Sequence, residues 1–378
     1  MQQTNHIPQH HFIVLVHGLD GETQDFTSFK ENLTKCWESQ VSKLESKHHL
    51  HILVSKYNEK RKTRDGIDMV ALRLRAEIDR FFHRQILMPH RSTVSVQHKV
   101  KFSLMGYSLG GLIIRGAVGI LFHEPSEVLN YEIKQYLQPT SFMTICSPHL
   151  GVRRASNVTQ LMFDIYLNNM TGKTGKQLNL NDKPIHKLVQ LSDPNSNSFR
   201  AIKLFPYKTL FAPSNNDVLV PLESALLIET NNYPVPVSNV PNMFVVGYSN
   251  FAAEYHDLFK PYENSSVEYQ KLMKEPQRSS DHVSPYFYNQ FQHTNTTKIM
   301  LHNLQQLNWR KIVVEICVPS KMAVLSARVH MIPLNTAYLN NNKFKNNQAS
   351  LKCMALISSI LSKDHLQVRE LISPNQSK

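Results

Sequence analysis

The stretch from Val100 to Gly119, VKFSLMGYSLGGLIIRGAVG, limits what this chain can fold into more than any other. Its first apolar run stops at Gly106, and apolar residues return at helical spacing after Gly110. The pattern predicts a buried strand, a sharp turn that carries Ser108, and then a helix. The five residues from 106 to 110 read G-x-S-x-G, the sequence of a nucleophile elbow.

A turn this sharp brings the positions two before and two after the serine into contact, so both must be glycine. The chain has only 12 glycines among 378 residues, which makes a chance cluster around Ser108 improbable. The helix that follows points its free N–H groups and positive dipole end toward any oxyanion formed at the serine. We therefore expect Ser108 to be a nucleophile; the alternative is a turn used only for close helix packing.

A second turn follows the first apolar run of the chain. Residues 12–16 (FIVLV) predict a strand buried on both faces of a parallel sheet, and HGLDG comes directly after it. Hydrolases with a nucleophile elbow take a second oxyanion donor from such an early loop. We assign the oxyanion hole to the backbone N–H groups of Leu19 and Leu109. A simple strand-ending turn is the alternative.

Further apolar runs alternate with stretches of helical periodicity, which predicts a mostly parallel sheet flanked by helices on both faces, an α/β fold. The expected strands are residues 50–56, 100–105, 141–146, 207–212, 243–246 and 311–318. The expected helices are residues 26–37, 66–87, 299–309 and 349–361.

The predicted organisation is one domain with two insertions. Residues 1–11 form an N-terminal tail, 12–339 the domain, and 340–378 an Asn-rich linker and a C-terminal helix. Residues 151–200 carry an apolar stripe and are expected to form a cap or lid, although ordinary packing would leave the same stripe. Residues 249–297 show no periodic pattern and are expected to be an irregular surface insertion.

Two further residues follow predicted strands in the order of a catalytic triad. Asp217 comes after strand 207–212 and His330 after strand 311–318, giving the chain order Ser108, Asp217, His330. His330 would take the serine proton, and Asp217 would orient and stabilise the imidazole. A surface histidine is the alternative for His330. His149 is expected to be a structural loop residue.

The chain has 42 lysines and arginines against 29 acidic residues, a net charge of +13. This charge favours contact with anionic surfaces such as membranes, but compositional bias explains it equally well because the charge is dispersed. We expect no nucleic-acid partner. The four cysteines have no metal-ligand spacing, and neither a signal peptide nor a spanning segment is evident. We expect a cytoplasmic protein in peripheral contact with membranes, of open oligomeric state.

Several blocks together resemble the eukaryotic serine-esterase, lipase-like family of α/β-hydrolases: VLVHGLDGETQDF, TRDGIDMVALRLRAEI, FSLMGYSLGGLIIR, ICSPHLG and NNDVLVPLESA. The closing block, LNWRKIVVEICVPSKMAVLSARVHMIPLN, is similar to the family branch that presents the triad histidine there, at His330. Tyr107 stands where the family usually has histidine, a change expected to matter little. Some members align their histidine near Val324, and in that register this chain would lack its base.

The resemblance implies the α/β-hydrolase fold and hydrolysis of carboxylic esters, with lipid acyl esters the expected substrates. We expect an acyl-enzyme mechanism with water as the acceptor and with no metal or organic cofactor. Two alternatives stay open: a thioesterase or protein deacylase with the same triad, and an inactive hydrolase-fold adaptor in membrane trafficking.

Overall fold

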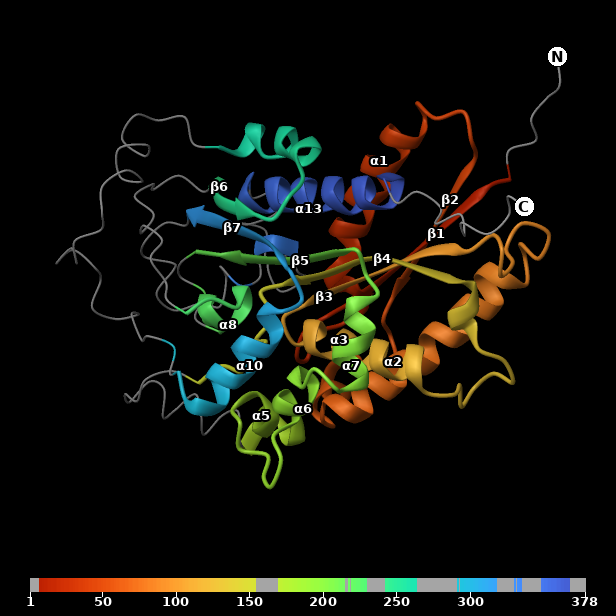
Figure 1. The fold of residues 1–378 in the computed structure, drawn as a ribbon. Coiled ribbons are helices and arrows are strands. Elements are labelled where there is room, and N and C mark those ends of the chain that lie inside the picture. Colours follow the sequence, from red (N-terminus) through yellow and green to blue (C-terminus); the bar gives the residue numbers. More distant parts are fainter. Residues whose placement is uncertain are drawn as a thin grey trace, which may run out of the picture.

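A computed structural model describes residues 7–153, 169–214, 217, 219–229, 242–263, 291, 293–317, 330, 332–334 and 348–367. Within these ranges a seven-stranded sheet forms the centre of the molecule (Figure 1), in the order β2-β1-β3-β4-β5-β7-β6. Its neighbouring strands run parallel, except that β6 pairs antiparallel with β7 at one edge. The predicted mostly parallel α/β fold is confirmed.

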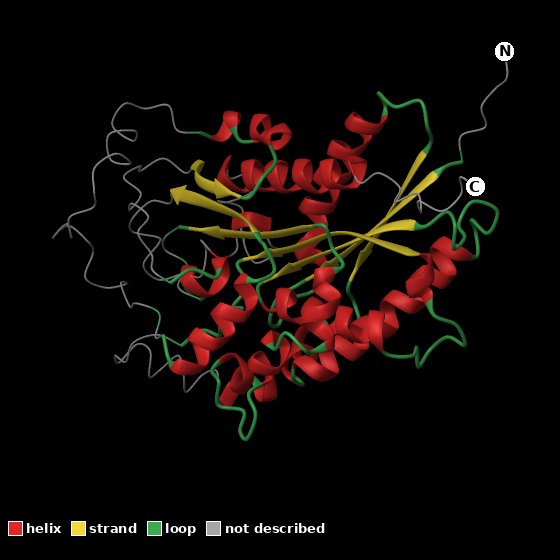
Figure 2. Cartoon of the chain, viewed as in Figure 1, coloured by secondary structure: helices red, strands yellow, loops and turns green. Residues whose placement is uncertain are grey.

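The strands are β1 Gln9–Val16, β2 His48–Val54, β3 Val100–Tyr107, β4 Leu137–Ile145, β5 Tyr207–Pro213, β6 Asn242–Ser249 and β7 Arg310–Cys317. The α-helices are α1 Thr27–Val41, α2 Ile67–Phe81, α3 Leu109–His123, α5 Gly172–Leu178, α6 Lys187–Ser192, α7 Asn197–Lys203, α8 Leu222–Leu226, α10 Asn295–Gln305 and α13 Gln348–Gln367. The short turns of helix are η1 Thr23–Phe26, η2 Lys60–Arg64, η3 Phe82–Leu87, η4 Ile133–Tyr136, η5 Ala253–Leu258, η6 Lys260–Tyr262 and η7 Ile332–Leu334. Figure 2 shows the helices arranged on both sides of the sheet.

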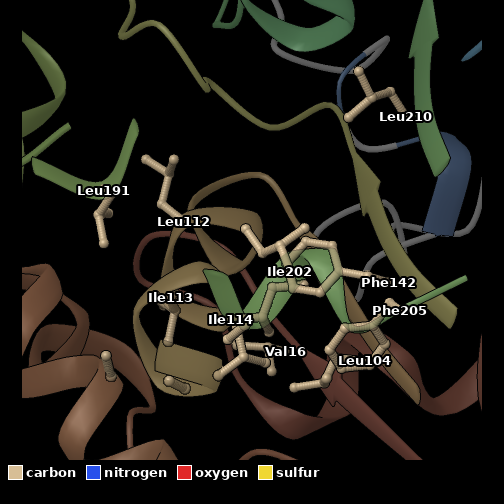
Figure 3. Packing of buried hydrophobic residues seen from close by; sticks show 14 of the residues in the cluster. Val16, Leu104, Leu112, Ile113, Ile114, Phe142, Leu191, Ile202, Phe205 and Leu210 are labelled. Atoms are coloured by element: carbon tan, nitrogen blue, oxygen red, sulfur yellow. The ribbon is translucent and has the colours of Figure 1, made fainter. Parts of the chain in front are cut away.

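Side chains on each strand alternate between two buried layers, as the pleat requires. In β1, Phe12 and Val14 face the layer under α2 and α3, whereas Ile13 and Leu15 face the layer under α1 and α13. Figure 3 shows the first layer, where Leu104 of β3 and Phe142 of β4 lie close to Ile202 and Phe205. The sheet is therefore covered on both faces, which explains the continuous apolar runs of its strands.

Part of the predicted cap region belongs to this core. Phe199 and Ile202 of α7 are fully buried, and a Cβ atom at Gly119 of α3 would lie 2.8 Å from the backbone nitrogen of Ser198. Because α7 packs closely on α3, α7 belongs to the helical layer that covers the sheet and is not part of a lid. The apolar stripe at 158–166 lies outside the described residues, and the lid role remains a prediction.

The C-terminal helix is also part of the domain, contrary to the predicted boundary at residue 340. Asp364 of α13 is fully buried and pairs with Arg310 of β7 through two hydrogen bonds of 2.6 and 2.9 Å. Tyr255 and Ser141 each donate a further hydrogen bond to it, both at 2.7 Å. A buried carboxylate with these partners fixes α13 on the sheet, because losing Arg310 would leave the Asp364 charge unpaired in the interior.

The N-terminal boundary also differs from the prediction. β1 begins at Gln9, so residues 9–11 of the predicted tail are strand. The imidazole of His11 packs against Trp37 of α1 and makes a 2.9 Å hydrogen bond with His48 of β2. These side-chain contacts extend the pairing of β1 with β2 beyond the apolar run that the sequence makes visible.

Candidate active site

Ser108 lies on the predicted elbow between β3 and α3. Its backbone has φ +54° and ψ −125°, a strained conformation for a residue with a side chain. A Cβ atom at Gly106 would lie 2.5 Å from the backbone of Gly110, and one at Gly110 only 2.1 Å from the carbonyl oxygen of Val16. The glycines that the sequence pattern selects are thus required by contact with backbone atoms.

The early HGLDG loop lies directly against the elbow. A Cβ atom at Gly18 would lie 2.9 Å from the Cβ of Ser108. Within the described ranges, nothing accepts a hydrogen bond from the backbone N–H of Leu19 or of Leu109. Both predicted oxyanion donors are therefore on segments next to Ser108 with their N–H groups available.

Arg64 holds this loop, and the sequence analysis did not identify it. Its Nε and Nη2 donate to the two carboxylate oxygens of Asp20, each at 2.7 Å, while Nη1 donates to the carbonyl of Met170. Asp20 also has φ +56°, and its N–H donates to the hydroxyl of Thr63. Both Thr63 and Arg64 belong to the TRDG block, and both hydrogen-bond to Asp20, the residue after Leu19.

Asp217 and His330 are brought together although 113 positions separate them. His330 Nδ1 lies 2.8 Å from Asp217 Oδ2, and their side chains are only 3% and 6% exposed. The other carboxylate oxygen accepts hydrogen bonds from the N–H groups of Leu219 and Val220. The carboxylate is thereby held in place, and an Asp217 acceptor fixes the proton of His330 on Nδ1.

The second ring nitrogen of His330 remains available. Nε2 is buried and has no hydrogen-bond partner in the described part of the chain. The predicted bond from Ser108 Oγ to Nε2 is accordingly not formed in this structure. Such bonds are commonly long without substrate and tighten in the reacting complex.

Tyr107 links the elbow to the base, contrary to the expectation that it would matter little. Its hydroxyl donates a 2.8 Å hydrogen bond to the backbone carbonyl of His330, and the two rings lie 5.1 Å apart. Burial raises the pKa of the Tyr107 hydroxyl well above its usual value, so it remains a donor. The residue immediately before Ser108 therefore positions the backbone of His330.

A family model described as "Putative serine esterase (DUF676)" matches residues 6–231, which is more than half of the chain. The chain belongs to this serine esterase family. The matched residues include Ser108, Asp217 and both predicted oxyanion donors, and His330 lies beyond them.

Two yeast proteins are among the relatives of this chain. It is 31% identical over 132 residues to "Putative lipase C4A8.10" of Schizosaccharomyces pombe, covering 33% of this chain and 16% of that protein. It is 27% identical over 224 residues to "Putative lipase ROG1" of Saccharomyces cerevisiae, covering 58% of this chain and 28% of that protein. The chain thus spans less than a third of the length of either relative.

Among solved structures, the phospholipase PlaB of Legionella pneumophila is similar to this chain with a TM-score of 0.32 and 17% identity, over 55% of this chain and 40% of that one. A likeness at that score bears on neither the substrate nor the site.

Cys146 lies next to the Asp217–His330 pair. Its Sγ, a carboxylate oxygen of Asp217 and a ring nitrogen of His330 all lie within 4.8 Å of one another. Burial, followed by the charge of Asp217, raises the pKa of the Cys146 thiol well above its usual value. A protonated thiol is a poor metal ligand, and the imidazole nitrogen nearest the carboxylate is already hydrogen-bonded. We therefore assign no metal to this centre.

His149 has only structural partners. It is fully buried, its Nε2 lies 2.9 Å from the hydroxyl of Thr144, and its Nδ1 lies 3.4 Å from Nη1 of Arg115. Burial and the Arg115 charge both lower the pKa of His149 well below its usual value. These contacts agree with the expected structural role.

Proposed function

We propose that this protein is a serine hydrolase that cleaves carboxylic esters through Ser108, His330 and Asp217. The observation that carries the proposal is the buried 2.8 Å hydrogen bond between His330 and Asp217, on a histidine whose Nε2 is unpaired and whose backbone is held by the residue before Ser108. A surface histidine would have none of these features.

In this mechanism His330 Nε2 removes the proton of Ser108 as Oγ attacks the ester carbonyl. The oxyanion is stabilised by the N–H groups of Leu19 and Leu109. His330 then gives the proton to the leaving alkoxide, which departs as an alcohol and leaves an acyl-serine. Water hydrolyses the acyl-serine by the same route, with His330 again the base. Asp217 stays ionised throughout and stabilises the imidazolium.

Lipid acyl esters are the substrate class that we propose. Both yeast relatives carry the name "Putative lipase", and the net charge of +13 favours approach to an anionic lipid surface. None of the helices within the described ranges could cross a membrane. Contact with a lipid surface through the charged exterior is part of the proposal.

The test of the chemistry is labelling with a fluorophosphonate probe, which reacts with activated serines. We expect the wild-type chain to be labelled and Ser108→Ala to remain unlabelled at the same melting temperature, because the substitution removes only one hydroxyl. Ser147→Ala is the matched control, since Ser147 is a buried serine beside the elbow glycines and should leave labelling intact. Absence of wild-type labelling would favour the inactive adaptor.

The substrate class is tested separately with p-nitrophenyl esters of increasing acyl length and with the matching thioesters. A lipid esterase should turn over long-chain oxygen esters best. Preference for the thioesters at every chain length would instead support the thioesterase reading.

A further inference from the structure

A group of histidines lies at the opposite end of the sheet from Ser108. His10 and His51 come from the first half of β1 and the middle of β2, and His90 from the segment after η3. His10 pairs in register with His49, and Phe12 with His51. Because side chains alternate along a strand, His10, His49 and His51 all point to the layer that contains Phe12. Ser108, by contrast, follows the carboxyl end of β3.

Three of these imidazoles converge on one point. A ring nitrogen from each of His10, His51 and His90 lies within 4.8 Å of the other two. Nδ1 of His10 is 3.1 Å from Nε2 of His51. The ring centroids of His10 and His90 are 4.5 Å apart, and those of His51 and His90 are 5.4 Å apart. Nitrogens bound at about 2.0–2.1 Å to one zinc ion lie at comparable separations.

Thr93 contacts the ring nitrogen of His10 that faces away from His51. The Thr93 hydroxyl donates to the carbonyl of His90 and also lies 2.9 Å from Nε2 of His10. With the hydroxyl proton on the His90 carbonyl, the hydroxyl oxygen can accept from His10 Nε2–H. In that tautomer Nδ1 of His10 carries a lone pair that faces His51. A metal-ligating histidine characteristically donates its other N–H to such an oxygen.

The segment that supplies His90 is built to hold its position. The carbonyl of His90 accepts hydrogen bonds from the N–H groups of Thr93 at 2.9 Å and Val94 at 2.8 Å, and the His90 N–H donates to Ile86. Val94 and Ile86 are themselves buried in the layer that contains Phe12. The third imidazole is thus presented to the strands by a folded loop rather than by an exposed tail.

We propose that His10, His51 and His90 form a binding site for a divalent transition-metal ion, with Zn²⁺ as the ion that fits best. His10 binds through Nδ1 and His51 through Nε2, whose proton moves to Nδ1 of the same ring. The ion joins β1 and β2 to the segment at 86–94, with a water in the fourth position. This site is separate from the catalytic centre and takes no part in ester hydrolysis.

The donor set selects the class of metal. Imidazole nitrogens favour Zn²⁺, Cu²⁺ and Ni²⁺, whereas Mg²⁺ and Ca²⁺ require oxygen ligands. The alternative is a stack of histidines held by their own hydrogen bond, which binds no metal.

The test is isothermal titration of the full chain, purified without a polyhistidine tag and stripped with chelator, with ZnCl₂ at pH 7.5. We compare His90→Gln with His98→Gln, which alters an exposed histidine on the same segment. The wild type and His98→Gln should bind one Zn²⁺ with equal affinity, and His90→Gln should bind it at least about 100-fold more weakly. MgCl₂ should produce no binding.

Thermal melting with and without Zn²⁺ gives a second readout. Zn²⁺ should raise the melting temperature of wild type and His98→Gln but not that of His90→Gln, while metal-free melting of all three checks that each chain folds. Failure of the wild type to bind Zn²⁺ would overturn the site, as would equal affinity in the two variants.

Discussion

The Tyr107 hydroxyl donates a 2.8 Å hydrogen bond to the backbone carbonyl of His330, and so joins the residue before the proposed nucleophile to the proposed base. The bond crosses 223 positions of sequence and is fully buried. It makes the placement of His330 depend on the elbow itself. A displacement of the elbow would therefore also displace His330.

Tyr107→Phe is therefore expected to lower kcat about 10-fold with little change in KM, because His330 loses a positioning bond while the substrate contacts remain. The buried carbonyl would lose its donor, which costs about 1–3 kcal/mol of stability. Ester turnover and thermal melting measure the two effects. Tyr136→Phe is the control, because Tyr136 lies at the amino end of β4, away from Ser108. A fall in stability with unchanged kcat would make Tyr107 a purely structural residue.

Asp217→Asn should reduce kcat by roughly 10⁴-fold, as in other triads, because an amide N–H in place of Oδ2 cannot accept from His330 Nδ1. The fold should survive, since the asparagine oxygen can still accept from Leu219 and Val220. Steady-state kinetics with a p-nitrophenyl ester is the measurement. Asp193→Asn changes an exposed aspartate and should have no effect; equal losses in both would remove Asp217 from the mechanism.

Arg64→Gln tests the clamp on the oxyanion loop. Losing two hydrogen bonds to Asp20 should let the N–H of Leu19 drift from the reacting carbonyl, and a displacement of about 1 Å can cost 100-fold in rate. We expect lower kcat with KM nearly unchanged. Arg61→Gln removes an exposed arginine from the same turn η2 as a control. An effect on KM alone would indicate a substrate contact instead.

Stability should fall as the pH drops below about 6.5. Burial lowers the pKa of His149 well below its usual value and that of His365 to about 3, so in the folded state these two rings stay neutral. The unfolded chain takes up protons near pH 6.5 and the folded chain does not, which costs about 1.4 kcal/mol per pH unit for each histidine. Urea unfolding between pH 7.5 and 5.5 measures the slope.

His149→Gln should reduce the dependence of stability on pH by the contribution of one histidine, about 1.4 kcal/mol per pH unit. Comparing the two chains cancels the opposite contribution of Glu77 and Asp79, whose pKa values burial raises. A stability that is constant from pH 7.5 to 5.5 in the wild type would contradict the account.

The sequence predicts the parts of the structure that local patterns encode. The apolar runs locate the strands, and the G-x-S-x-G pattern places Ser108 because the sharp turn brings Gly106 and Gly110 into contact. The partner of Tyr107 could not be predicted, since a hydroxyl gives no sign of which distant carbonyl it will meet. The direction of β6 was equally hidden, because one apolar run is compatible with either orientation.

The predicted limits of the domain were wrong where polar side chains pack in the interior. His10 and His11 look like a polar tail, yet contacts with His51, Trp37 and His48 bring both into the sheet. Asp364 lies beyond the predicted helix 349–361, yet it is buried on α13 and paired with Arg310. In both cases long-range partners, absent from local sequence, decide burial.

The central claim is that His330 is the base for Ser108, and turnover of a p-nitrophenyl ester by His330→Ala tests it most directly. The matched variant is His302→Ala, which changes an exposed histidine on α10. The account predicts a loss of several orders of magnitude, about 10⁴-fold or more, for His330→Ala and nearly wild-type turnover for His302→Ala. Retention of turnover by a folded His330→Ala chain would contradict it.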